Sequence, residues 1–183
     1  DKDFIRGYFR EVEIENKDFV ATLSPTSRRR SRIWPKEKFA QLGDALIDRY
    51  KARLILSWGP GEREYVEVIA RMMKRKPIVP PFTTIKQMGV MFYLSDIVVC
   101  NDNGPKHIAV AVGTPTVTIY GPTSPVTWSP QSELHKSLRA ELPCIGCNLN
   151  ECEHLTCMEM IGVEDVLNKV DEVQRIRQER RKW

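Results

Sequence analysis

The stretch DIVVCNDNGPKHIAVAVGTPTVTIYGP, residues 96–122, decides the fold of this chain. Its β-branched run at residues 97–100 is typical of a buried parallel strand, and a second such run follows at residues 116–120. Between the runs the chain must turn, and a helix is predicted to begin at Pro105 and to end at Gly113. Strand, turn, helix and strand in this order predict half of a doubly wound parallel sheet. In such sheets ligands, particularly phosphates, bind where the strands end.

Polar side chains fill the turn between these two strands. Asp102 and Asn103 follow the first strand, and His107 lies one helical turn further on. Asp and Asn commonly cap helices, so capping is the simplest role for the first two residues. Capping does not account for His107, which stands beside the capping groups and before an apolar stripe. A ligand role for the three side chains therefore stays open beside capping.

The composition places the chain among ordinary globular proteins. It has 183 residues, of which 42% are hydrophobic and 28% charged, enough for one well-packed domain with a small appendage. No apolar run reaches membrane-spanning length, and no signal peptide opens the chain. The net charge of +4 is mild, and no basic motif is interleaved with aromatics, which argues against nucleic-acid binding. Because the chain begins without Met, we expect it to be part of a longer protein.

The residues before this stretch repeat the alternation of strand and helix. Further strands are predicted at residues 19–23, 53–58 and 77–80, and helices after Pro35, at residues 62–73 and from an N-cap at Thr83 or Thr84. Five strand–helix steps imply an all-parallel core with right-handed crossovers. We expect residues 1–17 to be irregular, as a linker or the end of a preceding domain. Residues 122–142 are predicted to form an ordered excursion from this pattern, and a helix is predicted from residue 163 to 182.

An arginine-rich loop, SPTSRRRSRIWP at residues 24–35, lies between the first strand and its helix and is called the arginine loop below. Such a run of charged residues most often forms a solvent-exposed loop. The alternative is a phosphate clamp, in which guanidinium groups pair with phosphate oxygens and hydroxyl groups add hydrogen bonds. The position favours the clamp, because the loop should lie at the same edge of the sheet as Asp102.

Glu62 starts the helix that follows the second strand. It either complements the helix dipole or, as acids so placed do in nucleotide-binding sheets, accepts hydrogen bonds from ribose hydroxyls. Its position does not decide between the two. No P-loop is present, and no GxGxxG follows a strand, which disfavours a Rossmann-type oxidoreductase.

Four cysteines, Cys144, Cys147, Cys152 and Cys157, form a compact cluster with the spacing C-x2-C-x4-C-x4-C. This spacing could hold a structural zinc ion, although paired CxxC knuckles would indicate zinc more specifically. Reduced or partly oxidised thiols are the favoured alternative, and disulfides are not expected in a cytoplasmic protein. Nothing in the pattern indicates a catalytic thiol.

Taken together, these segments resemble a known family. VVCNDNGPKHIAVAVGTPTVTIYGPT is similar to the signature of glycosyltransferase family 9, the ADP-heptose:lipopolysaccharide heptosyltransferases. RIWP, SWGPGERE and FTTIKQM resemble the family's other blocks in the same order, and PCIGCNLNECEHLTCM is similar to the heptosyltransferase II branch. The resemblance covers residues 19–173. It implies that residues 18–183 are the carboxyl-terminal, nucleotide-sugar-binding half of a two-domain GT-B fold, with a Cys-rich segment at 143–158.

The resemblance implies where the donor's diphosphate would bind. Ser27, Arg28 and Arg32 match positions that contact the diphosphate, and Asn103 and Gly104 would offer backbone N–H groups to it at the helix start. Two of these residues depart from the family pattern. Arg32 replaces a position usually held by lysine, so a planar fork replaces a point charge. Asn103 replaces a small hydroxyl residue.

The rest of the donor is assigned in the same way. The resemblance implies that Glu62 binds the ribose, with Glu64 as the alternative register, and that Phe82 and Thr83 lie where backbone groups meet the adenine. Asp102 matches the acidic residue that holds the sugar hydroxyls.

The activity implied is transfer of a heptosyl group from ADP-heptose to the inner core of lipopolysaccharide, with inversion. Arg32 and Asp102 are the expected catalytic residues, Arg32 acting on the charge of the leaving group. His107 would lie beside them, and Lys106 departs from the family's apolar residue. The family's catalytic base lies in the amino-terminal domain, so residues 1–183 alone are expected to be inactive.

The implied partners are the ADP-heptose donor, a lipid A-core acceptor at the membrane surface and the amino-terminal domain of the same protein. The resemblance implies a cytoplasmic enzyme, peripheral at the inner membrane, that requires no cofactor and binds no nucleic acid. The alternative from another class is a nucleotide- or phosphate-binding module without catalysis.

Overall fold

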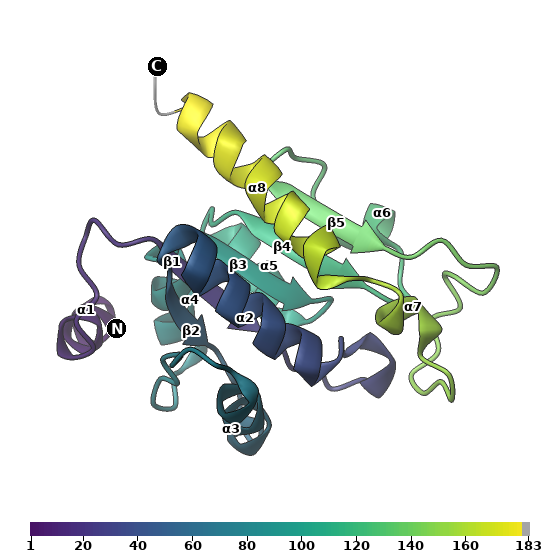
Figure 1. Cartoon of the computed structure of the whole chain (residues 1–183), viewed down its shortest axis with the longest axis horizontal. Coiled ribbons are helices and arrows are strands. Elements are labelled where there is room, and N and C mark those ends of the chain that lie inside the picture. Colours follow the sequence, from purple (N-terminus) through teal and green to yellow (C-terminus); the bar gives the residue numbers. More distant parts are fainter. Residues whose placement is uncertain (181–183) are drawn as a thin grey trace.

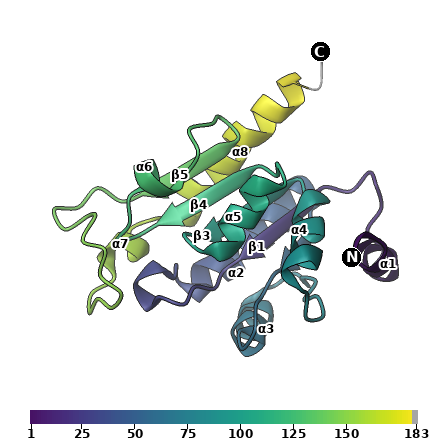
Figure 2. The same ribbon diagram turned by 180° about the vertical axis from the view of Figure 1, so that it is seen from behind.

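A five-stranded, all-parallel sheet forms the centre of the molecule (Figures 1 and 2). The computed structural model describes residues 1–180. The strands are β1 (Val20–Ser24), β2 (Arg53–Leu56), β3 (Ile97–Asn101), β4 (Thr116–Tyr120) and β5 (His135–Arg139), in the spatial order β2-β1-β3-β4-β5. Every residue of β1, β3 and β4 is buried, as expected for strands covered on both faces. The doubly wound parallel sheet predicted from the sequence is confirmed.

Helices cover both faces of the sheet. One face carries α2 (Lys36–Tyr50), α3 (Arg63–Met72) and α8 (Val163–Arg180), and the other carries α1 (Lys2–Glu11), α4 (Ile85–Tyr93) and α5 (Gly104–Ala111) (Figures 1 and 2). Because strand side chains alternate, each strand contributes to both cores: Val99 packs toward α2 and α8, whereas Val98 packs toward α4 and α5. Three short helices, η1 (Arg30–Arg32), α6 (Pro125–Trp128) and α7 (Thr156–Glu159), lie in the loops at the carboxyl ends of the strands.

The order of the strands creates a switch point between β1 and β3. From β1 the chain moves to β2 on one side, then crosses back to β3 on the other side of β1. The loops that follow β1 and β3 therefore diverge over opposite faces of the sheet. The crevice between such loops is where ligands bind in open α/β sheets.

Three expectations from the sequence are wrong. Residues 1–17 are not irregular, because they contain α1, whose Ile5 and Phe9 are buried against the core. Residues 77–80 form no named strand, and only the isolated parallel bridge between Ile55 and Ile78 is present there. Conversely, residues 122–142 contain an unpredicted strand, β5, whose sequence HKSLR is half-buried throughout at the edge of the sheet.

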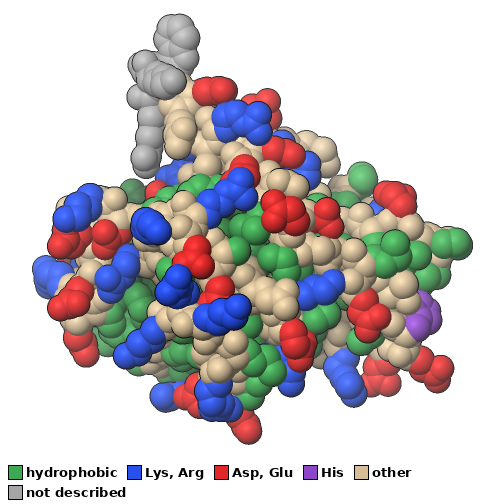
Figure 3. All heavy atoms as spheres, in the orientation of Figure 1, with side chains coloured by type: hydrophobic (Ala, Val, Ile, Leu, Met, Phe, Trp, Pro, Cys, Tyr) green, Lys and Arg blue, Asp and Glu red, His purple; other side chains and the backbone are tan. Residues whose placement is uncertain are grey.

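The helix ends agree with the sequence to within two residues. Thr84, one of the two predicted N-caps, forms a capping box with Gln87 at the start of α4. The last helix begins at Val163 as predicted, and the final two residues of its predicted range lie outside the described residues. Within residues 1–180, no helix combines the length and the apolar character needed to cross a membrane. The face over α2 and α8 intersperses acidic and basic side chains rather than gathering one sign (Figure 3).

Candidate functional site

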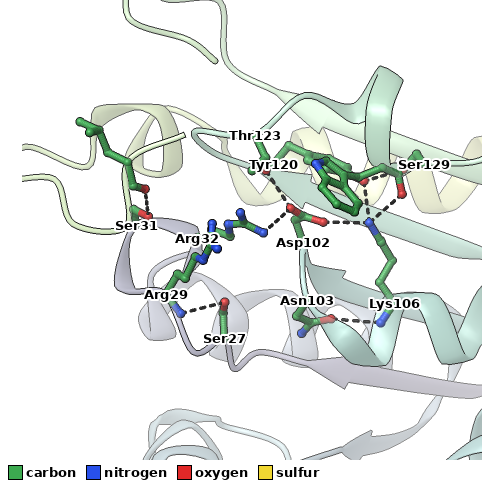
Figure 4. Close-up of polar contacts among 12 residues, drawn as sticks. Ser27, Arg29, Ser31, Arg32, Asp102, Asn103, Lys106, Tyr120, Thr123 and Ser129 are labelled. Carbon is green, nitrogen blue, oxygen red and sulfur yellow. Dashed lines mark hydrogen bonds and ion pairs between the residues drawn. The ribbon is translucent and has the colours of Figure 1, made fainter. Parts of the chain in front are cut away.

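The arginine loop and the turn after β3 meet at the carboxyl edge of the sheet (Figure 4). Arg32 Nη1 donates to Asp102 Oδ2 at 2.8 Å, although the two residues are 70 positions apart in the chain. Both loops follow adjacent parallel strands, so the topology delivers them to the same edge. The predicted meeting of the arginine loop with Asp102 is confirmed.

Asp102 is the centre of a buried polar network. Its Oδ2 accepts from Arg32 Nη1 and from Thr123 Oγ1, both at 2.8 Å, and its Oδ1 accepts from Lys106 Nζ at 2.8 Å. The side chains of Asp102 and Lys106 are 3% and 1% exposed, and that of Arg32 is 16% exposed. A buried carboxylate needs such partners because desolvation of an unpaired charge is expensive. One carboxylate thus faces two cations, and the group carries a net charge of +1.

Lys106 is a member of this network that the sequence reasoning did not single out as a site residue. Its Nζ also donates to Tyr120 Oη and to the Trp128 carbonyl, each at 2.9 Å, so all three ammonium protons have acceptors. Tyr120 Oη makes a further hydrogen bond with Ser129 Oγ at 2.7 Å. The sequence did hold a signal, since Asp102 and Lys106 are four residues apart at a helix start, where opposite charges pair.

Two asparagines join the arginine loop to β3 and α5. Asn103 Oδ1 accepts from Lys106 N at 3.0 Å and caps α5, while its Nδ2 donates to the Thr26 carbonyl at 2.8 Å. Asn101 Nδ2 donates to the Pro25 carbonyl at 2.7 Å, and its Oδ1 accepts from Trp34 N at 3.1 Å. The capping interpretation of Asn103 is therefore confirmed, and the side chain also holds the loop opposite. Gly104 begins α5 directly after this cap.

Glu62 connects the first two strand ends. Its Oε2 accepts from Thr26 Oγ1 at 2.7 Å and from Gly59 N at 2.8 Å, so it bridges the loops after β1 and β2. Glu64 is exposed in the first turn of α3. Of the two registers considered from the sequence, the structure places Glu62 against the arginine loop.

An aromatic pair stands beyond the end of β2. The rings of Trp58 and Phe82 are 5.8 Å apart, and Trp58 Nε1 donates to the Pro80 carbonyl at 2.9 Å. The Arg63 guanidinium lies over the Trp58 ring, 5.8 Å from its centre. Phe82 is 53% exposed, whereas Thr83 is buried. Phe82 thus presents an accessible apolar surface at this edge.

The remaining predicted residues lie on the arginine loop and on α5. Ser27 Oγ accepts from Arg29 N at 3.3 Å, and Arg28 is exposed. His107 is exposed on α5, with its ring edge-on to Trp128 at 6.4 Å. Partial burial, followed by the charge of Lys106, lowers the pKa of His107, which favours the neutral ring at pH 7.

The cysteine-rich segment braces the arginine loop. Ser31 Oγ donates to the Leu149 carbonyl at 2.6 Å, and Ser31 N donates to the Asn150 carbonyl at 3.4 Å. Asn148 N donates to the Pro122 carbonyl at 3.0 Å, which ties the same segment to the loop after β4. The cysteine-rich segment therefore packs onto the arginine loop and the loop after β4.

The cysteines themselves are all free thiols. Cys144 and Cys147 are exposed, Cys152 is half-buried and Cys157 is buried. Burial, followed by the neighbouring cysteines, raises the pKa of Cys157. Within residues 1–180, no three His, Cys, Asp or Glu side chains are placed so that they could hold a metal ion. The thiols as arranged do not fit a zinc site, and a structural zinc stays a prediction from spacing alone.

The fold and the site together define a class. A doubly wound sheet with a cationic, largely buried cluster at its switch point is typical of α/β proteins that bind anionic nucleotide ligands. Residues 6–157 match the model of glycosyltransferase family 9 (heptosyltransferase), and the chain belongs to this family. The family resemblance inferred from the sequence blocks is confirmed.

Individual relatives cover the chain to different extents. Lipopolysaccharide heptosyltransferase 3 of Escherichia coli (strain K12) is 32% identical over 121 residues, which are 64% of this chain and 35% of the relative. The solved structure of E. coli ADP-heptose lps heptosyltransferase II has a TM-score of 0.79 at 18% identity, covering 97% of this chain and 52% of that one. E. coli heptosyltransferase WaaC with ADP-2-deoxy-2-fluoro heptose has a TM-score of 0.65 at 24% identity, and the match covers 85% of this chain and 43% of that one. The chain thus spans about a third to a half of the length of the curated relatives it matches.

Proposed function

We propose that this chain is the donor-binding half of an inverting heptosyltransferase, which transfers a heptosyl group from ADP-heptose to the inner core of lipopolysaccharide. The observation that carries the proposal is the cluster of Arg32, Asp102 and Lys106, whose net positive charge lies at the switch point of a family 9 fold. The names of the relatives support the choice of donor and acceptor, since they describe lipopolysaccharide heptosyltransferases and an ADP-heptose enzyme.

The chemistry of the leaving group fits the parts at this edge. When the anomeric bond breaks, negative charge grows on the departing diphosphate and must be stabilised. Arg32 offers a guanidinium whose Nε is buried without a hydrogen-bond partner among the described residues, and an anionic ligand would supply an acceptor. The N-terminus of α5 adds backbone N–H groups and a favourable dipole. Arg32 would therefore act more on turnover than on ground-state binding if its contact strengthens as the bond breaks.

The other donor groups would be distributed along the same edge. Glu62, held between the loops after β1 and β2, would accept from the ribose hydroxyls, and the exposed ring of Phe82 would flank the adenine. Asp102 would hold sugar hydroxyls, with Ser27 and Arg28 at the diphosphate.

The acceptor and the base are proposed to come from outside this chain. Inverting transfer needs a carboxylate that activates the acceptor hydroxyl. Asp102 and Glu62 both accept several hydrogen bonds from their own chain, which favours holding over proton abstraction. The base would then lie in the other half of the protein, which would meet a lipid A-linked acceptor at the cytoplasmic face of the inner membrane. The same use of both acids as hydrogen-bond acceptors within the chain favours, as the second candidate, a nucleotide-binding module without catalysis.

Calorimetric titration with ADP, an ADP-sugar and NAD tests the proposal. We expect ADP and the ADP-sugar to bind and NAD not to bind. Arg32→Ala should weaken ADP binding by about tenfold or more, the size of a hydrogen bond to a charged group. Arg75→Ala is the matched control, because Arg75 pairs with Asp48 near the opposite end of α2 and is 56% exposed. Absence of ADP binding would refute the proposal, and heptosyl transfer by residues 1–183 alone would refute the placement of the base.

A further inference from the structure

The two cations on Asp102 use different oxygens of the carboxylate. Lys106 Nζ contacts Oδ1, whereas Arg32 Nη1 and Thr123 Oγ1 contact Oδ2, all at 2.8 Å (Figure 4). Neither cation therefore displaces the other. A single carboxylate neutralises only one of them, so the cluster keeps one positive charge in surroundings that are largely buried. Such a surplus is costly unless an anion joins the cluster.

The two cations differ in their ability to bind an added anion. Lys106 is fully buried, and its three protons are all donated within the chain, to Asp102, Tyr120 and Trp128. It has no proton left for a ligand. Arg32 lies in the arginine loop with its side chain 16% exposed, and its buried Nε–H has no acceptor among the described residues. A guanidinium has five N–H donors, so Arg32 can serve an anion while Lys106 cannot.

We propose that Lys106 is a positioning residue, the permanent counter-ion of Asp102 that releases Arg32 to the diphosphate of the nucleotide donor. This inference rests on the proposed function. Without Lys106, Asp102 and Arg32 would form a neutral pair, and a diphosphate would compete with the carboxylate for the guanidinium. With Lys106 in place, its ammonium group neutralises the carboxylate through Oδ1, and the positive charge of Arg32 is available to the ligand.

Lys106 also holds the loop after β4 through the Trp128 carbonyl, so a variant could act by loosening that loop instead. Two comparisons separate the electrostatic role from the structural one. Adenosine lacks the phosphates, so its affinity reports the shape of the site without the charge term. The double variant Asp102→Asn with Lys106→Met restores the cluster to the wild-type charge of +1, carried by Arg32 alone.

The test measures ADP and adenosine affinities by calorimetry for the wild type, Lys106→Met and the double variant with Asp102→Asn. We expect Lys106→Met to weaken ADP binding by about tenfold, as for the loss of one hydrogen bond to a charged group, and to leave adenosine binding unchanged. The double variant should return ADP affinity to within about threefold of the wild type, because the carboxylate no longer retains Arg32. ADP lacks the heptosyl group of the donor, so a contact between Asp102 and the heptose hydroxyls does not enter the comparison.

Four results would overturn the inference. Equal weakening of ADP and adenosine, or failure of the double variant to recover, would give Lys106 a structural role only. A Lys106→Met variant with wild-type ADP affinity would remove the inference and leave the proposed function intact. A wild-type chain that does not bind ADP would remove both.

If Lys106→Met does not fold, side-chain ¹⁵N spectra of the wild-type protein decide the question without a variant. Addition of ADP should shift the Arg32 Nε signal and leave the Lys106 Nζ signal in place. The opposite pattern, with Lys106 responding and Arg32 silent, would contradict the proposal.

Discussion

Replacing Asp102 with alanine should destabilise the fold strongly, because it leaves Lys106 buried without its counter-ion. The carboxylate receives contacts of 2.8 Å from Lys106, Arg32 and Thr123, and the Lys106 side chain is only 1% exposed. Breaking a buried pair by removing one partner costs about 3–5 kcal/mol, since the remaining charge stays desolvated. Arg32 is 16% exposed and can turn toward water, so most of the cost arises at Lys106.

Urea unfolding followed by tryptophan fluorescence measures this cost, because Trp34 and Trp58 are both buried. At about 2–4 °C per kcal/mol for a chain of this size, the midpoint of thermal unfolding should fall by about 6–20 °C. The matched control is Glu67→Ala. Glu67 pairs with Arg63 at the same 2.8 Å, but these side chains are 39% and 62% exposed, so the loss should stay below about 0.5 kcal/mol.

The reasoning would be refuted if Asp102→Ala cost no more than Glu67→Ala. That result would mean that Lys106 reaches water or another acceptor once the carboxylate is gone. The cluster would then not be a desolvated one, and the argument from its surplus charge would lose its basis. Asp102→Asn keeps an acceptor oxygen but not the charge, so its free energy of unfolding should lie between those of the alanine variant and the wild type.

Two further predictions concern the loop after β4 and the edge strand. A Cβ at Gly121 would lie 2.9 Å from the Ser31 carbonyl oxygen. Gly121→Ala should therefore displace the arginine loop, weaken ADP binding and cost about 1–3 kcal/mol of stability in urea unfolding. Gly7→Ala is the control, because nothing lies within 4 Å of a Cβ there, and equal effects of the two substitutions would contradict the prediction. Burial lowers the pKa of His135, so the folded state favours the neutral ring, and its contribution to stability is present above about pH 6.5 and lost as pH falls below it. His135→Gln keeps a polar partner for Thr116 Oγ1 and should flatten this part of the stability–pH curve. An unchanged slope in unfolding experiments as the pH falls below about 6.5 would exclude His135 as its source.

The sequence determined the central part of the fold. β1, β3 and β4 are buried on both faces, so their residues form continuous apolar or β-branched runs that local reading can recognise. The strands at the edges of the sheet were predicted less accurately. β5 has the polar sequence HKSLR because an edge strand is only half-buried, whereas residues 77–80 look strand-like but carry Pro77 and Pro80, which lack the N–H needed for a ladder.

The sequence also determined which residues reach the site, since Asp102, Asn103 and the arginine loop follow strands whose parallel order sends them to one edge. Only the tertiary structure decided what Lys106 does. A lysine at the start of a helix is usually solvated, and nothing local shows that the Tyr120 hydroxyl and the Trp128 carbonyl, 14 and 22 residues further on, close over its ammonium group. Local sequence shows which groups carry charge, but the partners that make burial of a charge affordable come from distant segments, and folding alone brings them together.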